Sequence, residues 1–140
     1  MRAFAVSPLT DEELSQLLWA AQGIADSKRQ FRTAPSAGAT YPLVVYVAKA
    51  DGVFRYHPEH HTLETVSDQD IRRALAAAAL DQFCVRQAAA VMIFAAVPER
   101  TTRRYGQRGE RYILMEVGHA AQNVHLQAVA LGLGSVPVGA

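Results

Sequence analysis

Two hydrophobic periodicities alternate along the chain and predict a mixture of helices and strands. Apolar residues recur at helical spacing after Thr10, and Thr10 and Glu13 form a capping box that begins this first helix. Gly23 is placed to end it. The stretch 24–33 is polar and without periodicity, so we expect a flexible loop there.

The next region predicts an antiparallel meander of three strands. The nearly continuous β-branched and aromatic run at 43–48 is typical of a strand covered on both faces. Turn signals at 51–52 and 58–61 separate two further strands, at 53–56 and 62–66. The last of these alternates apolar and polar residues, so we expect it to be half buried.

Helices surround one more buried strand in the following segment. The polar residues 67–70 are placed to start a helix that ends near Leu80. A short helical stretch at 81–85 then leads to a buried strand at 89–97, and 100–108 is a basic helical segment.

A long helix is predicted from Gly109 to about Leu131, followed by a strand at 135–140. Its apolar residues go most of the way round, as expected for a helix buried in a core or at a subunit interface. Five polar residues nevertheless share one face: Tyr112, Glu116, His119, Asn123 and Gln127. They form either a satisfied buried network or a dimer seam, and we favour the seam.

Composition narrows the class of protein. The 140 residues predict one domain, 1–140, and Lys plus Arg number 14 against 13 Asp plus Glu, which gives no charge field for nucleic acid or membrane. The single cysteine, Cys84, excludes an internal disulfide and suits a reducing compartment. A polar helix follows Met1, and no apolar run reaches the ~20 residues of a membrane span. We therefore expect a cytoplasmic, soluble protein with a small molecule or another protein as partner.

Two clusters invite a functional interpretation that we do not favour. His57, His60 and His61 lie on a predicted turn, where adjacent histidines are more often solvated than metal ligands, so we predict no metal. Five arginines lie between 100 and 111 and are interrupted by glutamates, which favours a solvated helix face over nucleic-acid binding. A binding site for an anionic ligand is a third possibility, between these two.

The 35–42 loop is the stretch of the sequence that most suggests a ligand-binding site. Pro35 and Pro42 bracket small residues, among them Ser36 and Gly38, that let the backbone approach a ligand closely. The alternative is a connector that enters the following strand. Spacing alone favours the connector.

Five segments in order carry a family resemblance: 14–23, 32–42, 104–112, 116–123 and 130–140. Together they resemble the FMN-dependent nitroreductase family, and within it the SagB-type dehydrogenases that include azoline oxidases of thiazole- and oxazole-peptide biosynthesis. The resemblance implies an α+β fold, a mainly antiparallel sheet flanked by helices with a long buried dimer-interface helix. It also implies a homodimer with two shared FMN sites.

Site residues follow from the same resemblance. Arg2 is the candidate for the FMN phosphate, and Gln82 for the pyrimidine edge of the flavin. Two backbone segments would lie against the flavin, the first supplied by the partner chain: Ser36, Ala37, Gly38 and Ala39, and then Pro137, Val138 and Gly139 beside N5 and O4.

Departures from the family pattern limit the assignment. Only Arg2-Ala3-Phe4 remains of the N-terminal phosphate motif, and the chain ends where relatives continue, so it resembles a member truncated at both ends. The Lys-Tyr pair of azoline oxidases is matched by Arg104 and Tyr105, and arginine cannot serve as a base. We therefore expect hydride transfer to or from a small-molecule or peptide substrate, with Tyr105 as candidate proton donor. The alternative is a non-catalytic dimeric scaffold.

Overall fold

The computed structural model describes residues 4–5 and 7–139, so Arg2 lies outside the described residues. The elements, in chain order, are α1 (Asp11–Gln22), β1 (Ile24–Asp26), β2 (Phe31–Arg32), the 3₁₀ turn η1 (Ala37–Ala39), β3 (Leu43–Lys49), β4 (Gly52–His57), β5 (Thr62–Ser67), α2 (Arg72–Ala78), α3 (Phe83–Gln87), β6 (Val91–Ala96), α4 (Glu99–Tyr105) and α5 (Arg108–Ala130).

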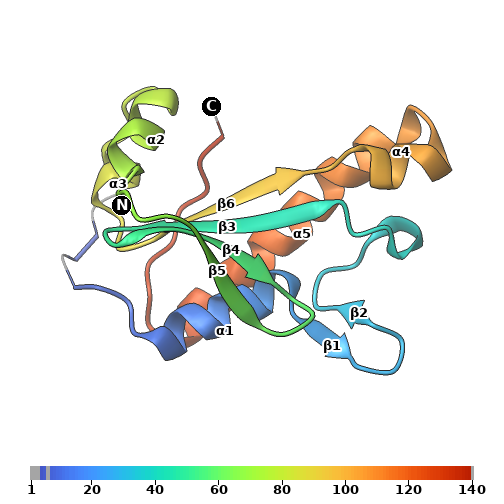
Figure 1. The fold of residues 1–140 in the computed structure, drawn as a ribbon, viewed down its shortest axis with the longest axis horizontal. Coiled ribbons are helices and arrows are strands. Elements are labelled where there is room, and N and C mark those ends of the chain that lie inside the picture. The colour runs from blue at the N-terminus through green and yellow to red at the C-terminus, as the bar shows by residue number, and fades with distance from the viewer. Residues whose placement is uncertain (1–3, 6, 140) are drawn as a thin grey trace.

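An antiparallel four-stranded sheet with the order β5-β4-β3-β6 forms the centre of the molecule. Helices α1 and α5 lie along one side of this sheet, α2 and α3 lie at one end of it, and α4 lies at the other end (Figure 1). The predicted α+β fold, with an antiparallel sheet flanked by helices, is confirmed. No helix among the described residues is long and apolar enough to cross a membrane.

Alternation along β3 explains how the sheet attaches to the helices. Val45 and Val47 point to one face and pack with Leu14 and Leu18 of α1 and with Tyr56 of β4. A second cluster joins the start of β3 to α5 and consists of Ala34, Leu43, Ile113 and Ala120. Ala34 belongs to the segment that enters the 35–42 loop, so the core fixes the base of that loop.

The capping box at the start of α1 is confirmed. The backbone N–H of Glu13 donates to Thr10 Oγ1 at 3.1 Å, and the N–H of Thr10 donates to the Glu13 carboxylate at 2.8 Å. Gly23 ends the helix, and its N–H donates to the Trp19 carbonyl at 2.7 Å. The signal was readable because all its atoms lie within one helical turn.

The prediction of a flexible loop at 24–33 was wrong, because β1 and β2 form a small antiparallel hairpin there. Asp26 Oδ1 accepts the N–H groups of Lys28 and Arg29 at 2.9 and 3.0 Å and stabilises the turn. The N–H of Thr33 also donates to the Gly23 carbonyl at 2.8 Å. These bonds hold the segment that leads into the 35–42 loop.

Two other local predictions were wrong for a shared reason. Strand β5 is almost wholly exposed, not half buried, because it is the edge strand and pairs only with β4. The described residues 135–139 form no strand, since no strand of the sheet is hydrogen-bonded to them. In both cases neighbouring elements decide the outcome, and the local sequence does not contain them.

The predicted start of a helix after residues 67–70 is confirmed. Helix α2 begins after Ile71, and Asp70 Oδ1 accepts the backbone N–H of Arg72 at 3.0 Å. The Asp70 carboxylate also binds the side chain of Arg72.

Candidate functional site

The 35–42 loop has an unusual backbone. Gly38, Ala39 and Tyr41 have φ values of +60°, +53° and +44°, in the left-handed region that costs a non-glycine residue about 1–2 kcal/mol. Such a conformation persists only where surrounding contacts enforce it. The loop is therefore a shaped structure, not a simple connector.

Helix α4 supplies several of the enforcing contacts. The Thr40 and Thr101 hydroxyls lie 2.8 Å apart, and Arg100 Nη1 donates to the Tyr41 carbonyl at 3.0 Å. Arg104 Nη1 donates to the Gly38 carbonyl at 3.3 Å. The loop is thus bound along its length to the helix that carries Arg104 and Tyr105.

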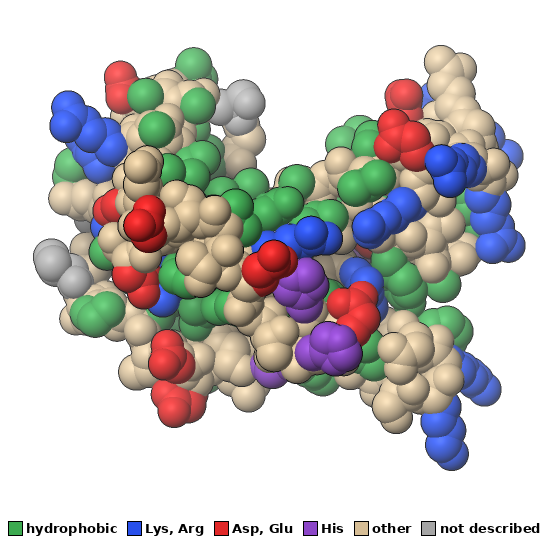
Figure 2. Space-filling model, in the orientation of Figure 1, with side chains coloured by type: hydrophobic (Ala, Val, Ile, Leu, Met, Phe, Trp, Pro, Cys, Tyr) green, Lys and Arg blue, Asp and Glu red, His purple; other side chains and the backbone are tan. Residues whose placement is uncertain are grey.

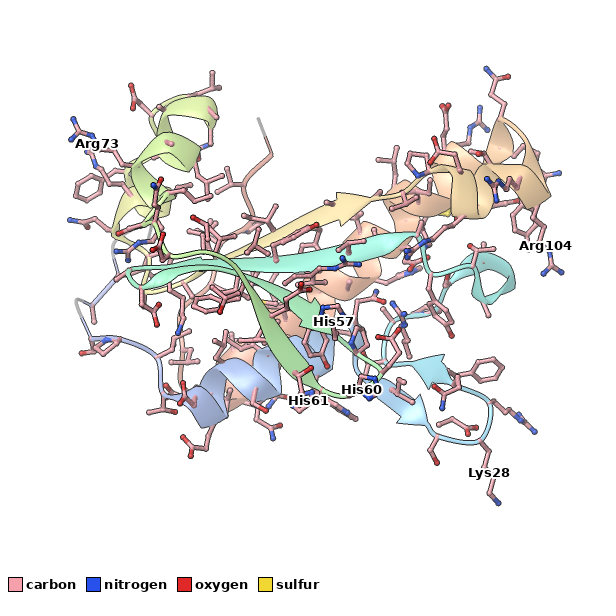
Figure 3. The ribbon with its side chains drawn as sticks, in the orientation of Figure 1. Lys28, His57, His60, His61, Arg73 and Arg104 are labelled. Atoms are coloured by element: carbon pink, nitrogen blue, oxygen red, sulfur yellow. The ribbon has the colours of Figure 1, made fainter. Side chains whose placement is uncertain are left out.

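Gly38 lies directly against these two predicted catalytic residues. A Cβ atom at this position would be 2.5 Å from the Tyr105 hydroxyl oxygen and 3.0 Å from Arg104 Nη1. Tyr105 packs edge-on against Tyr112 with ring centroids 5.1 Å apart. Arg104 lies in the last turn of α4, at the end of the molecule that this helix occupies (Figure 3). The structure brings Gly38, Arg104 and Tyr105 together within one chain, so only a glycine fits.

The remaining predicted flavin residues lie elsewhere. Gln82 occupies the position before α3, and the exposed segment 137–139 follows Val136. Val136 and Phe4 pack against the cluster of Ala76, Cys84 and Val85 formed by α2 and α3. These residues are at the opposite end of the sheet from the 35–42 loop (Figure 1). One chain therefore holds two separate groups of predicted site residues.

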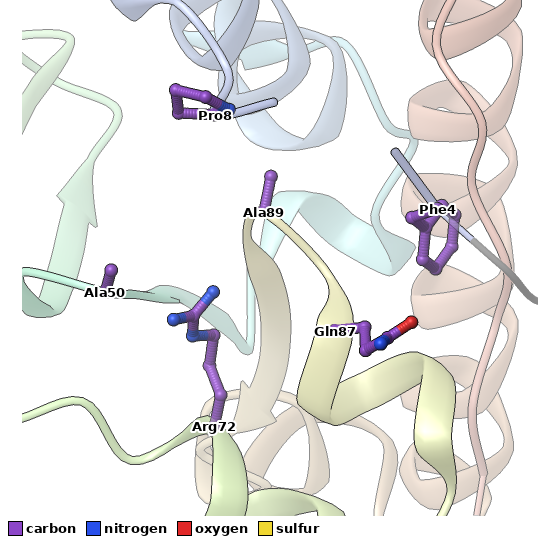
Figure 4. A pocket seen from close by; sticks show the side chains of 6 residues that line it. All are labelled: Phe4, Pro8, Ala50, Arg72, Gln87 and Ala89. Carbon is purple, nitrogen blue, oxygen red and sulfur yellow. The ribbon is translucent and has the colours of Figure 1, made fainter. Parts of the chain in front are cut away.

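A cavity of about 320 Å³ lies near this second group. Its lining consists of Phe4, Pro8, Ala50, Arg72, Gln87 and Ala89 (Figure 4). Arg72 is fully engaged, with Nη1 donating to the Ala88 carbonyl at 2.8 Å and Nη2 donating to Asp70 at 2.6 Å. Among the predicted site residues that the structure describes, none lines the cavity, so the cavity does not define the candidate site.

The polar stripe of α5 turns inward at two positions. Glu116 is only 2% exposed, and Asn123 Nδ2 donates to the Thr33 carbonyl at 3.2 Å. The dimer seam that we favoured for this stripe was wrong for Glu116, which is buried within one chain, whereas Asn123 is half-buried and its part in a seam stays a prediction. His119 on the same stripe is exposed. The sequence pattern predicted that these polar residues share one face of α5, but not that this face turns partly toward the interior of the chain.

The histidine turn is more ordered than expected. His57 Nε2 is 2.7 Å from Glu64, and His61 is 2.7 Å from the Ser15 hydroxyl and 2.8 Å from the Tyr56 hydroxyl; only His60 projects without a bond among those described (Figure 3). Within the described part of the chain, no three His, Cys, Asp or Glu side chains form a group able to hold a metal ion.

Burial raises the pKa of Tyr56 to about 12 from its ordinary value of 10.0. The folded state thus holds the phenolic proton more tightly than the unfolded state. We expect the free energy of unfolding to fall as the pH rises from about 10 through 12, because ionisation favours unfolding in this window. An ultraviolet tyrosinate titration should show one of the five tyrosines ionising late, and Tyr56→Phe should remove that step. Simultaneous ionisation of all five would contradict the prediction.

Exposed arginines gather at the α4 end of the molecule (Figure 2). Three of them bind groups of their own chain: Arg100 and Arg104 donate to the 35–42 loop, and Arg108 donates to the Tyr112 hydroxyl at 2.7 Å. These contacts agree with a helix face that supports the loop.

The chain belongs to the nitroreductase family, which it matches over residues 1–140. It is 52% identical over 146 residues to a protein of Methanocaldococcus jannaschii assigned as a nitroreductase, with 100% of this chain and 73% of that protein covered. Members of the family are in general flavin-type oxidoreductases, and this is the class that fold and sequence define.

Two solved structures are similar to most of the chain. One is a protein of Ralstonia eutropha JMP134, assigned as a nitroreductase, with a TM-score of 0.85 and 34% identity over 97% of this chain and 63% of that chain. The other is the Escherichia coli microcin synthetase McbBCD complex with truncated pro-MccB17 bound, with a TM-score of 0.80 and 26% identity over 92% and 53%. The chain spans less than two thirds of either structure.

Proposed function

We propose that the chain is an FMN-dependent oxidoreductase that transfers hydride to or from a small-molecule or peptide substrate in the cytoplasm. The observation that carries the proposal is the Gly38 backbone, exposed at φ +60° beside the cation of Arg104 and the phenol of Tyr105. An exposed backbone without a side chain, next to a cation and a proton donor, suits a flat, electron-rich ligand. Membership of the nitroreductase family supports the same cofactor class.

The residues would divide the work as follows. Bound FMN would supply hydride transfer at its N5 atom. The backbone of Ala37, Gly38 and Ala39, with Ser36, would lie against the ring, and Gln82 would bind the pyrimidine edge. Arg2 would bind the phosphate, and Pro137, Val138 and Gly139 would pass N5 and O4. The Arg104 guanidinium would stabilise negative charge, whereas Tyr105 is the side chain able to donate a proton.

A homodimer completes this site in the proposal. The loop and the 137–139 segment lie at opposite ends of one chain, so a second copy must supply one of them. Helix α5 carries large apolar side chains on a single exposed face: Leu114, Met115, Leu126 and Val129, with 72, 58, 62 and 75% exposed. Gly118 lies on the same face and lets another helix backbone approach. Such a face is suited to pair with its own copy across a twofold axis.

A peptide is a reasonable substrate within the SagB-type branch. The E. coli microcin synthetase complex, at 26% identity, carries truncated pro-MccB17. Arg104 replaces the lysine of the azoline oxidases, however, and a guanidinium cannot remove a substrate proton. The second candidate function is a non-catalytic dimeric scaffold, which the apolar face of α5 would also support.

FMN binding and oligomeric state test the two candidates together. The purified protein should be yellow, or should quench FMN fluorescence on titration, and saturating FMN should raise the melting temperature. Sedimentation should give a dimer that FMN stabilises. A dimer that neither contains nor binds FMN would reject the enzyme and favour the scaffold.

A further inference from the structure

A buried polar cluster lies beneath the 35–42 loop, where α1, β2 and α5 meet. Gln22 is 0% exposed and Glu116 is 2% exposed, and the Arg32 side chain is 12% exposed. Arg32 Nη1 donates to Gln22 Oε1 at 3.0 Å, and Nη2 reaches Glu59 at 3.2 Å. Burying such groups is costly unless each is paired, so the cluster requires a reason.

The Ser36 hydroxyl connects this cluster to the loop. Its oxygen accepts the backbone N–H of Tyr41 at 2.9 Å, which closes the loop across its three positions of positive φ. The Glu116 carboxyl is buried below the same hydroxyl, close enough for Ser36 to lower the pKa of this carboxyl as a hydrogen-bond donor. Ser36 therefore directs its side chain inward and leaves the backbone of Gly38 and Ala39 facing outward.

Glu116 is incompletely satisfied in this position. Its Oε1 has no hydrogen-bond partner in the described structure, and neither has Gln22 Nε2, although the Gln22 amide lies near enough to influence the carboxyl. Burial raises the pKa of Glu116, and the bond from Ser36, the charge of Arg32 from β2, and His119 of its own helix oppose that rise. The Ser36 hydroxyl is the neighbour of this carboxyl that belongs to the 35–42 loop, so a carboxyl kept here at such a cost can act on the loop through Ser36.

We propose that Glu116 is a positioning residue, which fixes the 35–42 loop through the Ser36 hydroxyl and so shapes the backbone surface that Gly38 and Ala39 present to the ligand. The part concerning the flavin rests on the function proposed above. The part concerning the loop does not, because it concerns contacts within one chain.

Two substitutions of similar volume separate the alternatives. Glu116→Gln keeps an oxygen that can accept from Ser36, whereas Glu116→Leu does not. We expect hydrogen exchange at the Tyr41 amide to accelerate about tenfold and FMN to bind about tenfold more weakly in Glu116→Leu, and both to stay near wild type in Glu116→Gln. Leu18→Ala, in the core under β3, is the control for general loss of stability.

A double-mutant cycle tests whether the effect passes through Ser36. Ser36→Ala alone should reproduce the faster Tyr41 exchange, and Ser36→Ala combined with Glu116→Leu should add little to it. Additive effects, wild-type exchange in Glu116→Leu, or equal loop exchange in Leu18→Ala would each overturn the proposal. If the wild-type protein binds no FMN, the proposed function fails, and the exchange cycle in the flavin-free protein still decides the role of Glu116.

The pH dependence offers an independent readout. The folded state holds the Glu116 proton more tightly than the unfolded state, so this group contributes stability at low pH that is lost as the pH rises through its raised pKa. Denaturant unfolding across that window should be steeper in pH for wild type than for Glu116→Gln. Identical slopes would show that folding does not shift the pKa of Glu116, and would contradict a carboxyl held in the cluster at a cost.

Discussion

Gly38→Ala is expected to weaken FMN binding by about 10- to 100-fold. The left-handed φ alone costs about 1–2 kcal/mol in a residue with a Cβ, and each 1.4 kcal/mol is about tenfold in affinity. The new Cβ would also lie 2.5 Å from the Tyr105 hydroxyl oxygen, so the loop or the tyrosine must move. Fluorescence titration with FMN measures the loss.

Gly132→Ala provides a control for this prediction. Gly132 also has a positive φ, +71°, but nothing lies within 4 Å of a Cβ added there. The substitution therefore introduces a side chain at positive φ without the collision. Combining Gly38→Ala with Tyr105→Phe should recover part of the affinity. Equal losses in Gly38→Ala and Gly132→Ala would mean that close approach to Tyr105 is unimportant.

Leu126→Glu is expected to separate the proposed dimer and abolish FMN binding together. Leu126 is 62% exposed in the single chain, so the charge costs the folded monomer little. Burial in a subunit interface would turn it into a desolvated carboxylate that has replaced an apolar contact, a loss of roughly 3 kcal/mol or more and about a hundredfold in dimer affinity. Sedimentation and FMN titration at the same protein concentrations measure the two effects.

A control on another surface distinguishes the interface from a general charge effect. Gln16→Glu places a carboxylate at an exposed position of α1 and should leave both the dimer and FMN binding unchanged. A Leu126→Glu protein that remains dimeric would place any dimer contact elsewhere. A monomer that still binds FMN as tightly as wild type would contradict a site shared between two chains.

Local signals were sufficient for much of the fold. The capping box of Thr10 and Glu13, the end of α1 at Gly23 and the extent of α5 depend on residues within a few positions of each other, and the structure agrees with the prediction at each. The exposure of β5 could not be predicted, because alternation in sequence does not reveal that no element covers an edge strand. The hairpin at 24–33 depended on the Asx turn at Asp26, a weak local signal that was available in the sequence.

For the candidate site, the sequence by itself determined the family and the small residues of the 35–42 loop, because a backbone that must approach another group closely restricts which side chains fit. Only the tertiary structure decided that Gly38 lies against Tyr105, that the 137–139 segment lies at the far end of the sheet, and that Glu116 faces inward. Helix α5 carries both an apolar face and a polar stripe, and either could be buried by its pattern alone. Glu116 turns inward toward Arg32, Gln22 and Ser36, residues distant in the sequence whose charge and polar groups oppose the cost of burying its carboxyl.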